Sequence, residues 1–100
     1  MTEGKIIKYS SHLSFRLSLR KIPQDLPRII YLRSRRRYFD IATDTAVAVM
    51  RARLNKRQRD IMIVYREDDD DVLIITVHPL KRNQLENRIH SGRWQKLAIL

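Results

Sequence analysis

The spacing of apolar residues along the chain changes near residue 36, from a helical period to a strand period. Before that point, apolar side chains recur every three or four positions, which predicts helices over residues 11–21 and from Pro23 to about Leu32. Ser10 or Ser11 suits the N-cap of the first helix, and Pro23 suits the first turn of the second. Residues 5–9 are short and β-prone, and could open the fold as an edge strand.

The second half of the chain alternates in the manner of β-strands and ends in one more helix. The expected strands are residues 37–43, 45–54, 61–66 and 72–78. A polar turn (residues 55–60) and an acidic loop (Glu67 to Asp71) connect the later strands, and a helix over 81–91 follows, with Gly92 after its end. The chain is therefore expected to form a single α+β domain over residues 1–100. It would have two N-terminal helices, a four-stranded antiparallel sheet and a C-terminal helix.

Composition excludes several classes of protein. The chain of 100 residues has no Cys, which excludes a disulfide scaffold, thiolate metal ligands and a Cys nucleophile. It has only 2 Gly, which excludes a Gly-rich phosphate-binding loop. No apolar run approaches the roughly 20 residues of a membrane span. The first residues also lack an apolar stretch of signal-peptide length, so we expect a cytoplasmic protein with no membrane partner.

The charge of the chain points to a polyanionic partner. Lys and Arg total 21 against 11 Asp and Glu, a formal net charge of +10, and Arg outnumbers Lys by 15 to 6. The planar guanidinium group matches phosphate geometry, so a small Arg-rich domain favours nucleic acid. The alternative is a domain whose basic surface binds an acidic protein.

The first predicted helix carries a stripe of functional side chains between two apolar flanks. His12, Arg16 and Arg20 are spaced four apart and therefore lie on one side of that helix. A His with a pKa near neutrality and Arg residues that hold phosphate could cleave RNA by attack of the 2′-OH, with no metal or cofactor. In the alternative interpretation, the Arg stems only cover apolar surface. Because His12, His78 and His90 lie on three separate predicted elements, no metal site is predicted.

Further residues on the later elements are candidates for nucleic-acid binding. They are Arg51, Arg53, His78, Lys81, Arg88, Arg93 and Trp94. Trp94 could stack on a base, or it could cover the core. The adjacent carboxylates from Glu67 to Asp71 point in divergent directions on a hairpin, so they predict a solvated loop rather than a cation site.

Three short motifs together resemble a known family. They are Ser11-His12-(x)3-Arg16-(x)3-Arg20-x-Ile22, the strand end Val77-His78-Pro79, and Ser91-Gly92-Arg93-Trp94. Across residues 9–94 this pattern resembles a small prokaryotic family of RelE-like toxins, within the barnase, EndoU, colicin and RelE fold group. Lys21 departs from the pattern, which usually has Gly at that position.

The resemblance implies a metal-independent endoribonuclease-like toxin, silenced by a separate antitoxin protein. It would make His12 a general acid or base, and Arg16 and Arg20 phosphate binders. Members of the fold group differ in their catalytic residues, so a non-catalytic RNA-binding module and a protein-interaction domain with an acidic partner remain alternatives. The apolar tail from Leu97 to Leu100 leaves a homodimer open.

Overall fold

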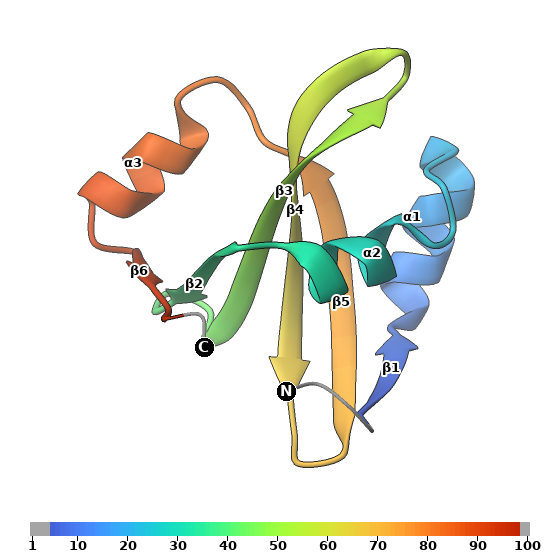
Figure 1. Cartoon of the computed structure of the whole chain (residues 1–100), viewed down its shortest axis with the longest axis horizontal. Coiled ribbons are helices and arrows are strands. Elements are labelled where there is room, and N and C mark those ends of the chain that lie inside the picture. The colour runs from blue at the N-terminus through green and yellow to red at the C-terminus, as the bar shows by residue number, and fades with distance from the viewer. Residues whose placement is uncertain (1–4, 99–100) are drawn as a thin grey trace.

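A six-stranded mixed sheet forms the centre of the molecule, with strand order β1-β5-β4-β3-β2-β6 (Figure 1). The computed structural model describes residues 5–98. β1 runs parallel to β5, and the other neighbouring strands are antiparallel. The elements are β1 (Ile6–Tyr9), α1 (Ser11–Arg20), α2 (Leu26–Arg33), β2 (Arg36–Asp40), β3 (Thr45–Leu54), β4 (Arg57–Glu67), β5 (Asp71–Pro79), α3 (Gln84–His90) and β6 (Trp94–Lys96).

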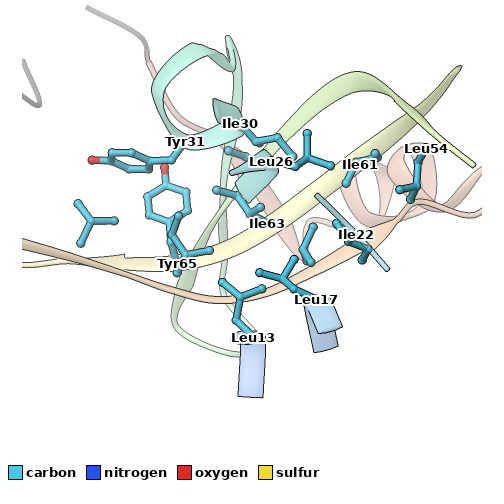
Figure 2. Packing of buried hydrophobic residues seen from close by; sticks show 14 residues of the cluster. Leu13, Leu17, Ile22, Leu26, Ile30, Tyr31, Leu54, Ile61, Ile63 and Tyr65 are labelled. Atoms are coloured by element: carbon cyan, nitrogen blue, oxygen red, sulfur yellow. The ribbon is translucent and has the colours of Figure 1, made fainter. Parts of the chain in front are cut away.

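The larger hydrophobic cluster lies between one face of the sheet and the helices α1 and α2 (Figure 2). Leu13 and Leu17 of α1 are 0% and 1% exposed, which shows that this side of the helix docks on the sheet. From α2, the ring of Tyr31 meets the ring of Tyr65 on β4 edge-on, with centroids 5.1 Å apart. Alternate residues of β4, such as Ile61 and Tyr65, point into this cluster.

The opposite face of the sheet carries a second, smaller cluster. It contains Tyr38, Val47, Val49, Met62, Leu80 and Trp94, with Leu85 of α3 packed against it. Because β4 buries Met62 here and Ile61 and Ile63 on the other face, the strand has a nearly continuous apolar sequence. The two helical layers lie toward different edges of the sheet, α1 near β1 and α3 near β6 (Figure 1).

Local signals set the ends of several elements where the sequence predicts them. Ser10 caps α1, because its Oγ accepts a hydrogen bond from Leu13 N at 3.0 Å. Lys21 follows α1 in the left-handed conformation, with φ 54°, at the position that glycine favours. β3 has the predicted bounds, and Gly92 follows α3 with φ 80°.

The expected four-stranded antiparallel sheet is wrong. The sheet has six strands and is mixed, because β1 adds in parallel to β5 and β6 adds to β2. Both added strands are short, 4 and 3 residues, and their pairing depends on distant partners rather than on a local hairpin. The parallel pairing of Ile6 with Asp71 spans most of the chain and leaves no mark in the local sequence.

Two predicted boundaries are also wrong, for local reasons. The first turn of α2 contains Pro27, not Pro23, so the helix begins at Leu26. The expected polar turn over 55–60 is only Asn55 and Lys56, both with positive φ, and β4 already begins at Arg57. Two consecutive residues with positive φ form a tight hairpin turn that matches the twist of the strands, so the polar residues that follow are free to pair.

Candidate functional site

The stripe on α1 lies against the open part of the edge of β5. β1 pairs with β5 only as far as Ile74, so on this edge the later backbone groups of β5 have no strand beside them, although β4 pairs with them on the other side. Arg16 takes the place of that strand at one point, since its Nε donates to the carbonyl oxygen of Val77 at 2.9 Å. Ser10 Oγ similarly donates to the carbonyl oxygen of Ile75 at 2.7 Å. These bonds hold α1 in a defined position along β5.

The two apolar flanks of α1 behave differently. Leu13 and Leu17 of one flank are buried. On the other flank, Phe15 and Leu19 are 65% and 63% exposed, and only Ile22, which lies beyond the end of α1, is buried. The stripe therefore separates a docked side of the helix from an exposed one. Arg16 is half-buried in this position, whereas His12 and Arg20 are exposed.

His78 joins the stripe from the sheet. Nη2 of Arg16 donates to Nδ1 of His78 at 2.9 Å, which places an imidazole of β5 directly beside the middle residue of the stripe. Burial lowers the pKa of His78 below 6.5, and the positive charges of Arg16, His12 and Arg20 lower it further. The structure thus brings Arg16 of the stripe into contact with His78, which comes from a different element, while His12 and Arg20 influence His78 only through their charge.

On the α3 side of the sheet, His78 also lines a pocket of about 290 Å³. Met62 and Val64 contribute apolar surface to it, and Lys81 and Arg88 contribute positive charge. His78 therefore links the α1 stripe to this pocket. Thr76, whose hydroxyl oxygen lies 3.4 Å from Nε2 of His78, was missed by the sequence analysis, because a Thr in an apolar strand carries no signal of its own.

Arg93 and Trp94 have structural partners. The two oxygens of Asp40 accept hydrogen bonds from Nε and Nη2 of Arg93 at 2.9 and 3.1 Å, and from the indole N–H of Trp94 at 3.2 Å. Trp94 is 3% exposed and stacks on Tyr38, so it presents no free face to a base. This is the core placement that the sequence left open as the alternative to base stacking.

Other Arg residues are also engaged within the fold. Arg36 forms a hydrogen-bonded ion pair with Asp60 at 2.8 Å, and this bond holds the pKa of the carboxyl below its ordinary value. Arg37 donates to the hydroxyl of Tyr65 at 3.0 Å and to the backbone carbonyl of Tyr31. The strand expected over residues 37–43 includes Arg37 but not Arg36, whereas β2 begins at Arg36 and both side chains are part of its packing.

Arg51 and Arg53 are exposed on the same face as Val47 and Val49, toward the β3–β4 hairpin. Arg51 lies 3.8 Å from Asp60, a long contact that leaves most of its guanidinium in solvent. A second pocket of about 270 Å³ at this end is lined by Arg51, Lys81 and Arg82, among others. Lys81 lines both pockets, so the exposed cations are continuous from the hairpin to His78.

The acidic loop is tied to the first strand rather than arranged around a cation. Lys5 reaches Glu67 Oε2 at 3.2 Å and the carbonyl of Asp68 at 2.8 Å, and Lys8 pairs with Asp71 at 3.1 Å. Within residues 5–98, no three His, Asp or Glu side chains are grouped so that they could hold a metal ion. In the same part of the chain, no helix has the length and apolar character needed to cross a membrane.

No protein-family model, curated protein or solved structure matches this chain. The site is therefore interpreted from its own residues.

The apolar tail from Leu97 to Leu100 is described only in part. Leu97 and Ala98 are exposed, and Ile99 and Leu100 lie outside the described residues.

Proposed function

We propose that this chain binds RNA and cleaves it without a metal ion, in the manner of a cytoplasmic RelE-like toxin. One observation carries the proposal. Arg16, the middle residue of the stripe, donates a hydrogen bond to His78, and the charges of His12 and Arg20 on the same stripe also act on that imidazole. Exposed cations extend from that region toward the β3–β4 hairpin, which would suit the phosphates of a longer strand.

The reaction that this set suits is cleavage of an RNA phosphodiester by the neighbouring 2′-hydroxyl group. The 2′-oxygen of a ribose attacks the adjacent phosphorus, the bond from phosphorus to the 5′-oxygen breaks, and a 2′,3′-cyclic phosphate and a 5′-hydroxyl result. His12, which is exposed, takes the proton of the 2′-OH, and solvent returns one to the leaving oxygen. Arg20, also exposed, would bind the phosphate and offset the charge that develops on it.

Arg16 has a different role in this proposal. Its Nε and Nη2 are engaged by Val77 and His78, so it fixes the arrangement and adds positive charge without presenting its whole guanidinium to the phosphate. The role expected from the sequence, direct phosphate binding, therefore falls mainly to Arg20.

The test is a cleavage assay in EDTA with the wild type, His12→Ala and a control, His90→Ala. His90 is a second exposed His on α3, so its replacement matches the first in chemistry and exposure. We expect His12→Ala to cleave at least about 100-fold more slowly, His90→Ala to match the wild type, and the product to end in a 2′,3′-cyclic phosphate. Undiminished cleavage by His12→Ala would remove this residue from the mechanism.

A non-catalytic RNA-binding module is the second candidate. The pocket at the β3–β4 hairpin favours it, because Arg51, Lys81 and Arg82 offer phosphate contacts that need no chemistry. This candidate predicts steeply salt-dependent binding and no product at any protein concentration. An acidic antitoxin would compete for the same cations, and co-purification from the native host would reveal it.

A further inference from the structure

The contact between Arg16 and His78 determines which nitrogen of the imidazole carries the proton. A guanidinium group has only N–H donors and stays protonated in proteins. Nη2 of Arg16 lies 2.9 Å from Nδ1 of His78, so Nδ1 must be the acceptor. The proton of the neutral ring is then on Nε2. Turning the ring over would place a C–H group against the guanidinium instead.

The surroundings of His78 keep its ring neutral. Burial lowers the pKa of His78, and three positively charged or titratable side chains of α1 (Arg16, His12 and Arg20) lower it further. Lys81 and Arg88, which line the pocket with His78, are also positively charged. The acid in the same pocket, Asp40, is already bonded to Arg93 and Trp94.

The Nε2–H group of His78 has only a distant hydrogen-bond acceptor within the chain, so an external acceptor could bind it more closely. Its partner is Thr76 Oγ1 at 3.4 Å, well beyond the usual length of about 2.9–3.0 Å for an N–H···O bond. A shorter bond to an anionic oxygen would be stronger, because bonds to charged acceptors are short and strong. The pocket that His78 lines also contains two long cationic side chains, Lys81 and Arg88.

We propose that this pocket binds a phosphate oxyanion through the Nε2–H of a neutral His78, whose tautomer Arg16 fixes, with Lys81 and Arg88 supplying the positive charge. His78 is then a hydrogen-bond donor and not a proton acceptor, which leaves proton transfer to His12. The inference rests on the proposed function only in taking the phosphate to be part of RNA. It does not require that the RNA be cleaved.

The first experiment measures the tautomer directly by NMR on protein labelled with ¹⁵N-histidine, at pH 7. We expect the His78 ring to show a protonated Nε2 and a bare Nδ1, with the resonance identified by its loss in His78→Gln. In Arg16→Met, the ring loses the donor at Nδ1, and we expect the two tautomers to mix. An imidazolium, or a proton on Nδ1, in the wild type would overturn the proposal.

The second experiment measures binding of a short single-stranded RNA with 2′-O-methyl groups throughout, which binds but cannot react through its 2′-oxygens. His78→Gln keeps an N–H donor near the position of Nε2, and His78→Ala removes it. We expect Gln to bind within about twofold of the wild type and Ala about tenfold more weakly, as for loss of one bond to a charged group. Equal weakening in both variants, unchanged binding in both, or no binding by the wild type would contradict the proposal.

The two proposals can fail separately. Should His78→Gln retain binding while the wild type cleaves no RNA, the anion site stands and the ribonuclease proposal does not. Should His78→Gln bind RNA but lose cleavage while the wild type cleaves, His78 carries a proton, and the assignment of a fixed donor is wrong.

Discussion

Replacing Asp40 by Asn tests whether a buried carboxylate holds β6 to the sheet. Oδ1 of Asp40 accepts from Ala42 N at 3.0 Å and from Nε of Arg93, and Oδ2 accepts from Nη2 of Arg93 and the indole of Trp94. Every partner is a donor. An Asn of the same shape can accept from the donors at the Oδ1 position or from those at the Oδ2 position. Its NH₂ group must then face the donors at the other position.

The size of the effect follows from the burial of those partners. The indole N–H of Trp94, a residue 3% exposed, loses its acceptor without gaining water if the NH₂ group of Asn is on that side, at about 1–3 kcal/mol. If the NH₂ group is on the other side, the N–H of Ala42 and Nε of Arg93 lose their acceptor instead. The Arg93 side chain is 34% exposed and regains water, so its loss adds little. We expect Asp40→Asn to lower the free energy of unfolding by about 2 kcal/mol, or roughly 8–16 °C in Tm for a domain of this size.

The assay is urea unfolding followed by fluorescence and by circular dichroism. Trp94 is the only Trp, so fluorescence reports on the β6 end of the sheet, while circular dichroism reports on the whole fold. Asp44→Asn is the matched control, since Asp44 is exposed in the neighbouring turn and its φ of 57° suits Asn. If Asp40→Asn unfolds within about 0.5 kcal/mol of that control, the carboxylate does not hold the edge of the sheet.

The same carboxylate sets a pH dependence. Burial alone would raise the pKa of Asp40, but hydrogen bonds from Arg93, Ala42 and Trp94 outweigh it and lower the pKa below 3.8. A group whose pKa is lowered in the folded state stabilises the fold above its unfolded pKa, and that stability is lost as the pH falls through the folded value. The wild type should therefore lose stability below about pH 4 more steeply than Asp40→Asn, and equal slopes would contradict this assignment.

Three further predictions concern the docking of α1 on the sheet, the C-terminal end of α1, and the exposed Arg residues of β3. Leu17→Ala should destabilise the fold by about 2–5 kcal/mol in thermal unfolding, and Leu19→Ala, exposed two positions away, by less than about 1 kcal/mol. Lys21→Gly should raise the free energy of unfolding by up to about 1 kcal/mol, because φ is 54° there, and a loss of stability would contradict the left-handed helix end. Replacing Arg51 and Arg53 by Ala should reduce the slope of log affinity against log salt for single-stranded RNA by about 0.7 for each lost contact, and an unchanged slope would place the RNA elsewhere.

Much of the secondary structure is predictable because it depends on near neighbours. The alternation from Thr45 to Leu54 defines β3 and its two faces, and Ser10 marks the start of α1 through a bond to a residue three positions on. Boundaries failed where two local signals competed. Pro23 and Pro27 both suit the first turn of a helix. The polar side chains after Lys56 are typical of a loop, although β4 begins with them at Arg57.

For the candidate site, the helical period places His12, Arg16 and Arg20 on one stripe, and this much needs only the sequence. That His78 lies beside Arg16 depends on how α1 docks along β5, 62 residues further on. The burial of Trp94 is likewise decided by Asp40 and Tyr38 on another strand. Charge counting could not separate exposed cations such as Arg20 from Arg93, which the fold holds in an ion pair.

The sequence by itself therefore determined the existence of the helices and long strands, the two faces of β3, the stripe on α1 and the net positive charge. The tertiary structure alone decided the six-stranded mixed sheet, the partner of each charged side chain and the meeting of α1 with His78. The physical reason is the range of the interactions. Helical and strand periods arise from backbone geometry over a few residues, whereas the pairing of β1 with β5 and the environment of an imidazole depend on segments brought together only by burial of the common core.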